Sequence, residues 1–155
     1  MKHDCVFCGI ISGKVECSKV AEDAHAVAFM DVRPFNAGHV LVVPRRHVAG
    51  LVELTEDEAA EVFRLVHRVA SALPESGVRC EGCHVSQANG AAAGQEVFHV
   101  HFHVVPRFPG DPVRLVVDPA RPQYPREELT RVAASIAGVL AGRKREKSRS
   151  RKSSN

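Results

Sequence analysis

The sequence contains no long hydrophobic run. None of the segments in its 155 residues approaches the roughly 20 apolar residues that a membrane-spanning helix needs. The first residues, Met1 to Cys5, also lack the apolar stretch of a secretory signal peptide. These absences argue against a membrane-spanning protein and against secretion, so we expect a cytoplasmic protein.

Internal repeats and interior linkers are absent as well, so the 155 residues suit one domain of ordinary size. Hydrophobic residues make up 45% of the chain and charged residues 25%, which is the balance of an ordinary globular protein. Five cysteines are present. In a cytoplasmic protein they predict thiols or metal ligands, because disulfides are rare in that compartment.

The basic charge is confined to the C-terminal end of the chain. Residues 143–152 hold seven Lys or Arg and one Glu, a local charge of +6 that leaves residues 1–142 at −3. This segment is almost devoid of apolar residues and cannot offset its ordering entropy by burial. We therefore predict a domain over residues 1–142 and a disordered basic tail over 143–155. The tail could contact nucleic acid or an acidic surface, or be a solvated extension without a partner.

Hydrophobic patterning predicts short strands around one long helix. Thr55 and Glu58 form a capping-box pattern at the start of that helix, which ends before Pro74. A second amphipathic helix is predicted over residues 126–142. The predicted strands are residues 15–21, 26–31, 39–44, 83–88 and 97–107. Short connections between strands predict an antiparallel sheet and the α+β class.

Three histidines, His99, His101 and His103, alternate with apolar residues inside the last predicted strand. Successive side chains of a strand point to opposite faces, so all three imidazoles are predicted to leave one face. Val100 and Phe102 would then anchor the opposite face in the core. Imidazole acts as base, acid, nucleophile and metal ligand near neutral pH, so the row predicts a functional site.

The histidine row and its surroundings resemble the histidine-triad (HIT) family of nucleotidyl hydrolases and transferases. The family pattern, His-x-His-x-His followed by two apolar residues, is matched by residues 99–105. Gly94-Gln95, the segment from Gly38 to Pro44, and the segment from Ala28 to Asp31 follow the family's order and spacing. The resemblance implies the HIT fold, with about five antiparallel strands, one long helix and a C-terminal helix, in a homodimer.

The resemblance also implies catalytic roles. Family members break a phosphorus bond at the α-phosphate of a nucleoside monophosphate derivative through a nucleotidyl-histidine intermediate, and by position His101 is the nucleophile. His103 and His39 match positions that donate hydrogen bonds to the phosphate, and Gln95 matches a polar residue near the leaving group. The carbonyl that orients the nucleophile in the family belongs to the backbone, and the sequence alone does not reveal it.

The implied substrate site surrounds these residues. Asp31 matches the residue that binds the ribose hydroxyls. The other implied substrate-binding residues are Asn89 and Gly94 near the phosphate, and Phe7, Ile10, Phe29 and Val32 around the base. Each of those four apolar residues could equally be ordinary core, and Asn89-Gly90 taken alone is typical of a turn.

Two departures from the phosphoramidase relatives concern the leaving group. Glu96 stands where those relatives often carry Ser or Thr, and a carboxylate aimed at a phosphate would be repulsive. We expect Glu96 to turn outward or to contact a leaving-group amine. The sequence has no Trp, so the Trp-containing C-terminal end that shapes substrate choice in that branch is missing.

Cys5 and Cys8 have the two-residue spacing of a zinc chelate. Many bacterial-type HIT proteins combine this pair with two histidines in a structural zinc site, and the matching residues here are His47 and His99. Four protein ligands would close the coordination sphere, so this metal would hold structure; the alternative is two unligated thiols. Residues 80–84 match a haem-attachment pattern, which we attribute to chance because no secretory signal is present.

Three readings of the histidine row stay open at this point. The first is a homodimeric nucleotide hydrolase, with Mg as a companion of any polyphosphate substrate. The second is a metallohydrolase in which the three histidines bind zinc, which leaves the Cys pair and the glycine loop unexplained. The third is a nucleotide-binding adaptor without turnover. Phosphoramidates, aminoacyl-adenylates and dinucleoside polyphosphates all present the same α-phosphate.

Overall fold

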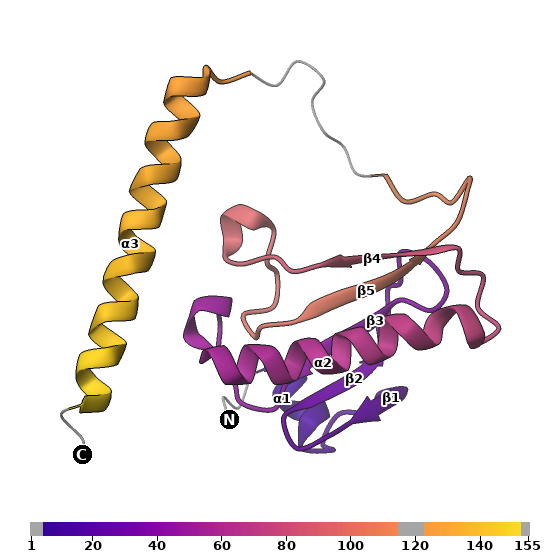
Figure 1. Cartoon of the computed structure of the whole chain (residues 1–155). Coiled ribbons are helices and arrows are strands. Elements are labelled where there is room, and N and C mark those ends of the chain that lie inside the picture. Colours follow the sequence, from indigo (N-terminus) through magenta and orange to yellow (C-terminus); the bar gives the residue numbers. More distant parts are fainter. Residues whose placement is uncertain (1–4, 115–122, 153–155) are drawn as a thin grey trace. The chain divides into compact units, whose positions relative to one another are not determined.

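The computed structural model describes residues 5–114 and 123–152. The chain divides after Arg114 into two compact units, residues 1–114 and 115–155. The first unit contains a five-stranded antiparallel sheet (Figure 1). The predicted α+β class and the antiparallel sheet are therefore confirmed.

The strand order places the histidine-bearing strand next to the middle of the sheet. The strands are β1 (Lys19–Glu22), β2 (Ala26–Met30), β3 (Val40–Pro44), β4 (Gly82–Ser86) and β5 (Phe102–Arg107). Their order across the sheet is β1-β2-β3-β5-β4, so β1 and β4 form the edges. β3 is rich in valine and buried along its whole length, because both faces of the sheet are covered at this strand.

The long helix α2 (Glu56–Ala72) covers one face of the sheet (Figure 1). It begins as predicted, since the Thr55 hydroxyl accepts the Glu58 N–H and the Glu58 carboxylate accepts the Thr55 N–H. The buried stripe of the helix packs against β2, β3 and β5 and consists of Val62, Leu65, Val66 and Val69. This packing forms the larger core and holds the sheet that carries the site.

A smaller core lies on the opposite face of the sheet. The short helix α1 (Val6–Ile11) places Phe7 against Phe29 of β2, with ring centroids 5.5 Å apart. Leu41 and Val43 of β3 complete this cluster. The segment that carries the Cys pair is thereby held against the face to which the histidines point.

The predicted strand over residues 97–107 is wrong in its first half, because β5 begins only at Phe102. The Val100 N–H donates to the Val48 carbonyl, and the His99 N–H donates to the Val97 carbonyl. The backbone before Phe102 is thus bonded to a loop and not to β3. The predicted alternation nevertheless holds, since Val100 and Phe102 are buried in the core beneath α2.

The helix α3 (Arg126–Lys152) extends ten residues beyond the helix predicted over 126–142. Backbone helix therefore runs through most of the segment expected to be disordered, and residues 153–155 lie outside the described part. The prediction rested on the lack of apolar residues, but Lys, Arg and Glu are good helix formers. The predicted domain boundary at residue 142 falls inside α3, whereas the compact units separate after Arg114. Within the described residues, no helix has the length and apolarity to cross a membrane.

Candidate functional site

His101 is oriented by the backbone of its own segment. Its Nδ1 lies 2.7 Å from the carbonyl oxygen of His99. A carbonyl oxygen can only accept, so Nδ1 carries the proton and Nε2 keeps a free lone pair. The ring is buried, with Phe7 edge-on at a centroid distance of 5.3 Å. This arrangement suits a nucleophilic nitrogen.

His39 and His103 form a directed hydrogen-bond chain. The backbone N–H of Phe35 donates to His39 Nδ1 at 3.2 Å, so that nitrogen must accept and the His39 proton resides on Nε2. His39 Nε2 lies 2.9 Å from His103 Nδ1 and donates to it. His103 consequently carries its proton on Nε2, where it is available to an acceptor such as a phosphate oxygen.

Burial keeps this pair neutral. Desolvation lowers the pKa of the fully buried His39 below its usual value, against the opposing effect of Asp31. Desolvation is the largest cause that lowers the pKa of His103, and together with the neighbouring His101 and His39 it brings this pKa to about 4. Both rings are therefore neutral near pH 7, as the hydrogen-bond chain requires.

Asp31 lies beside the hydrogen-bonded pair of His39 and His103. One carboxylate oxygen, Oδ1, accepts the Arg33 N–H at 2.8 Å, and Oδ2 lies 3.5 Å from His39 Nδ1. The Asp31 side chain retains 18% exposure. A partly exposed carboxylate next to the histidine pair can accept hydrogen bonds from neighbouring hydroxyl groups.

Gln95 ties the glycine-rich loop to its neighbours. Its Nε2 donates to the carbonyls of Ala49 and Val97, and its Oε1 accepts the Gly90 N–H. Gln95 is buried, and both of its amide hydrogens are committed to backbone. Gly94 in this loop has φ of +85°, a conformation that L residues rarely adopt. The two residues shape the loop before the histidine segment.

The other predicted substrate residues are not all brought together. Asn89 points its Oδ1 to the Leu51 N–H at 2.7 Å, so its described contact holds a loop. Phe7 is buried beside His99 and His101. Phe29 is buried against Phe7, and Ile10 packs on the same cluster, whereas Val32 is 92% exposed. Glu96 is exposed and faces Arg33 at 3.8 Å, in line with an outward-turned carboxylate.

Cys5, Cys8, His47 and His99 converge on one point. Their ligand atoms all lie within 4.8 Å of one another. The two His Nδ1 atoms are 3.3 Å apart, and the Sγ–Nδ1 distances are 3.4–3.7 Å. A tetrahedral ion with Zn–N and Zn–S bonds of about 2.1 and 2.3 Å requires edges of roughly 3.4–3.8 Å. The four residues could therefore hold a metal ion.

The tautomer of His99 fits this cluster. His99 Nε2 lies 2.9 Å from the Pro44 carbonyl and must donate to it, which leaves the Nδ1 lone pair facing the cysteines. Desolvation lowers the pKa of His99 to about 4, so this ring is also neutral near pH 7. The three rings of the row thus serve different neighbours and do not converge on one ion.

A sequence profile of the HIT domain family matches residues 12–110. The chain belongs to this family. It is similar to the protein named Protein hit of Bacillus subtilis, with 37% identity over 140 residues that cover 90% of this chain and 96% of the relative. It is also similar to adenosine 5'-monophosphoramidase hnt1 of Schizosaccharomyces pombe, with 40% identity over 138 residues that cover 88% of this chain and 98% of that protein.

Solved structures of HIT proteins share the fold. A HIT family protein from Bacillus anthracis superposes with a TM-score of 0.82 at 36% identity, covering 90% of this chain and 99% of that one. A Zn-bound histidine triad family protein from Mycobacterium smegmatis gives a TM-score of 0.69 at 36% identity, covering 90% and 97%. Members of the family are nucleotide hydrolases, and the resemblance inferred from the histidine row is confirmed.

Sequence reasoning missed the contribution of Phe35. Its backbone N–H sets the tautomer of His39, and its ring stacks on His39 with centroids 5.0 Å apart and planes 12° apart. Every residue type except proline has a backbone N–H, so residue types do not reveal this donor. The only indication in the sequence is that Phe35 precedes His39 by four residues.

The lowered pKa of His103 predicts a loss of stability on acidification. The folded pKa is about 4 and the unfolded pKa is near 6.5, so the unfolded chain binds the proton first. Stability from this group is complete above about pH 6.5 and declines as the pH falls toward 4. Between pH 7.5 and 5.0 we expect a loss of about 1 kcal/mol from His103, discounted for its partial exposure.

Urea unfolding of the wild type and of His103→Gln at both pH values measures this contribution. Carboxylates and the histidines remote from His103 contribute equally to both proteins, so the difference between them reports His103 together with its contacts to His39 and His101. Equal losses of unfolding free energy in the two proteins would contradict the assignment.

Proposed function

We propose that this protein hydrolyses nucleoside monophosphate derivatives at the α-phosphate, with His101 as nucleophile. The observation that carries the proposal is the His101 Nδ1 hydrogen bond to the His99 carbonyl, which frees Nε2 for attack. Attack forms the Nε2–P bond as the bond from phosphorus to the leaving group breaks. Water then attacks phosphorus, releases the nucleoside monophosphate and restores the ring.

The neighbouring groups suit the charge that develops during this reaction. The His103 Nε2–H is directed away from His39 and can donate to a phosphate oxygen, stabilising the transition state. Asp31 would accept hydrogen bonds from the ribose hydroxyls. Gln95 and Gly94 shape the loop whose backbone N–H groups would approach the phosphate. The His99 carbonyl stabilises the positive charge that His101 acquires when its second nitrogen is bonded.

A zinc hydrolase built on the histidine row is less consistent with this geometry. His99 faces the cysteines, His101 a backbone carbonyl, and His103 a neighbouring histidine. The name of the S. pombe relative supports a phosphoramidate substrate, in which a nitrogen leaves phosphorus. Dinucleoside polyphosphates present the same reacting phosphorus, and Mg would accompany them as a bound counterion.

His101→Ala tests the nucleophile directly. We expect its turnover of an adenosine phosphoramidate to fall at least about 10³-fold, because the covalent route is lost, while nucleotide binding persists. His67→Ala is the matched control, since His67 is an exposed histidine on α2. Mass spectrometry of the wild type quenched during turnover should locate an added nucleotide on the peptide that contains His101. A turnover rate of His101→Ala equal to that of the wild type would contradict the proposal.

We also propose that zinc is the metal held by Cys5, Cys8, His47 and His99. The two thiolates and two imidazoles match the ligand preference of zinc, and the distances match its tetrahedral geometry. The similarity to the Zn-bound protein of M. smegmatis supports the assignment. With four protein ligands this ion would tie α1 to the histidine segment and leave no open position for water.

Cysteine substitutions test the zinc assignment. Elemental analysis of purified protein should find about one zinc per chain in the wild type and in Cys17→Ser. Cys17 is a partly buried thiol that packs on the smaller core, outside the cluster. Cys8→Ser should retain little or no zinc, because three ligands bind more weakly than four. Equal zinc content in all three proteins would refute the assignment.

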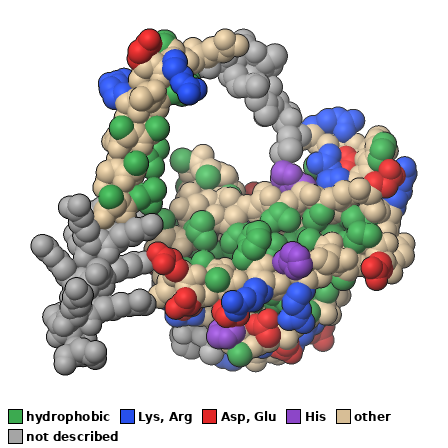
Figure 2. Space-filling view, viewed as in Figure 1, with side chains coloured by type: hydrophobic (Ala, Val, Ile, Leu, Met, Phe, Trp, Pro, Cys, Tyr) green, Lys and Arg blue, Asp and Glu red, His purple; other side chains and the backbone are tan. Residues whose placement is uncertain are grey.

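We propose that the protein is a homodimer that pairs through α2 and β4. β4 is an edge strand, and Val85 on it is 38% exposed. Phe63 on α2 is 53% exposed and stacks edge-on with Phe102. Hydrophobic side chains gather over α2 in the space-filling view (Figure 2). A second copy would cover this apolar surface and the open edge of the sheet.

Light scattering should give twice the monomer mass of 16.9 kDa for the wild type. Val85→Asp should shift the mass toward the monomer, because it places a charge on the proposed interface. Val20→Asp is the control, since Val20 is an exposed valine on the other edge strand, β1. An unchanged mass for Val85→Asp would contradict pairing through β4.

A further inference from the structure

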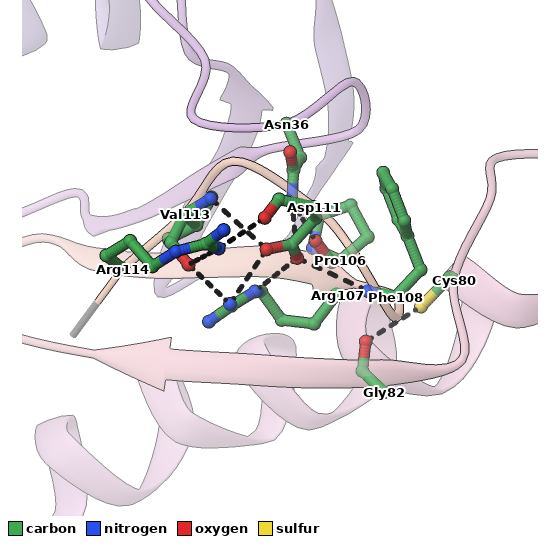
Figure 3. Close-up of polar contacts among 9 residues, drawn as sticks. All are labelled: Asn36, Cys80, Gly82, Pro106, Arg107, Phe108, Asp111, Val113 and Arg114. Atoms are coloured by element: carbon green, nitrogen blue, oxygen red, sulfur yellow. Dashed lines mark hydrogen bonds and ion pairs between the residues drawn. The ribbon is translucent and has the colours of Figure 1, made fainter.

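Asn36 is a buried polar residue that the reaction described above does not use. It lies in the loop between β2 and β3 and is only 7% exposed. Its side-chain Nδ2 donates to the Pro106 carbonyl at 2.9 Å and to Asp111 Oδ2 at 3.1 Å (Figure 3). Both amide hydrogens of Asn36 thus bond to the segment at the end of β5.

Asp111 is held firmly as the acceptor. Its carboxylate receives Arg107 through Nε at 2.5 Å and Nη2 at 2.9 Å, together with the backbone N–H groups of Phe108 and Val113 (Figure 3). Asp111 is 3% exposed, and its hydrogen bonds, led by those from Arg107, hold its pKa well below the usual range. The carboxylate is therefore a fixed anchor for Asn36.

The anchored loop carries the groups that orient His39. The Asn36 carbonyl accepts the backbone N–H of His39 at 3.0 Å. The residue before it, Phe35, donates its N–H to His39 Nδ1 and stacks on the same ring. One of the two backbone groups that bond to His39 therefore belongs to Asn36, and the other belongs to the residue before it. The Asn36 side chain holds both groups against the end of β5.

The position of the Phe35 N–H decides a competition for His39 Nδ1. Asp31 Oδ2 lies 3.5 Å from the same nitrogen and would favour a proton there. The Phe35 N–H excludes that proton, because two donors cannot share the position. If the loop shifted, His39 could protonate Nδ1 toward Asp31 and turn a lone pair on Nε2 toward His103.

A change at His39 would be passed to the reacting group. His39 Nε2, once an acceptor, would require the proton of His103 on Nδ1, since the two atoms lie 2.9 Å apart. His103 Nε2 would then present a lone pair to a phosphate oxygen, and the interaction would change from attraction to repulsion.

We propose that Asn36, anchored by Asp111, is a positioning residue that fixes the tautomers of His39 and His103 and thereby keeps a proton on His103 Nε2. This role deepens the proposed hydrolase function and rests on it for its effect on turnover. The tautomers themselves are properties of the resting protein and are measurable without any reaction.

Asn36→Ala tests the proposal by removing both side-chain hydrogen bonds. Long-range ¹H–¹⁵N spectra of the imidazoles report which ring nitrogen carries the proton. We expect the Nε2–H form of His39 in the wild type, and in the variant a shift to a mixture that includes the Nδ1–H form. With an adenosine phosphoramidate, kcat should fall about tenfold or more, while KM changes less than about threefold.

Asp111→Asn is the second variant, because it leaves the Asn36 side chain in place and changes only the group that accepts its hydrogen bond. It weakens the acceptor for Asn36 and should move the same imidazole signals in the same direction, by a smaller amount. Thr55→Ala controls for a general loss of stability, since it removes the cap of α2 and touches no residue of the chain to His103. Its imidazole spectrum and kcat should match the wild type.

The outcomes separate the two proposals. Unchanged His39 tautomers in folded Asn36→Ala and Asp111→Asn would overturn the positioning role, whatever happens to turnover. A shifted tautomer with unchanged kcat would overturn its link to His103. A wild type that shows the expected tautomers but no turnover at the α-phosphate would refute the hydrolase function and leave the assignment of the tautomers intact.

Discussion

The site depends on hydrogen bonds between backbone groups and ring nitrogens. A carbonyl oxygen can only accept and a backbone N–H can only donate, so each such bond places a proton without ambiguity. The His99 carbonyl does this for His101, the Pro44 carbonyl for His99, and the Phe35 N–H for His39. Chemically identical side chains thereby present a free lone pair at His101 Nε2, a lone pair that faces the cysteines at His99 Nδ1, and a donated proton at His39 Nε2.

These bonds are strong because the surrounding protein excludes water. His39 and His99 are fully buried, and His101 is nearly so. Burial lowers the pKa of His39, His99 and His103, which removes the competing charged forms in which both nitrogens donate. The two cores on either side of the sheet supply this burial, so packing and chemistry are inseparable here.

Much of the fold followed from the sequence because it depends on patterns of residue type. The capping box at Thr55, the valine-rich strand β3 and the alternation of Val100 and Phe102 with histidines each carry a direct physical signal. The predicted start of β5 is wrong, because the start of a strand depends on which backbone segment lies next to it, and the residue types do not reveal that segment. Val48, a loop residue, accepts the Val100 N–H that a longer strand would have given to β3.

The site was predictable to the same degree. The histidines and the Cys pair were found because their side chains are chemically distinctive, and the structure places Cys5 and Cys8 beside His47 and His99. The roles predicted for Asn89 and Gln95 stay predictions, because the bonds described for their side chains are to the backbone of loops. The hydrogen bond from Phe35 to His39 comes from the main chain, where every residue type except proline offers the same N–H group.

His99 connects the Cys–His cluster to the orientation of His101. Its ring lies in the cluster with the cysteines, while its own carbonyl accepts the hydrogen bond from His101 Nδ1. Only the Cα and the bonds beside it separate these two functions. A change that moves the His99 ring would therefore also move the carbonyl that fixes the His101 tautomer, so the Cys–His cluster and the orientation of His101 are coupled through one residue.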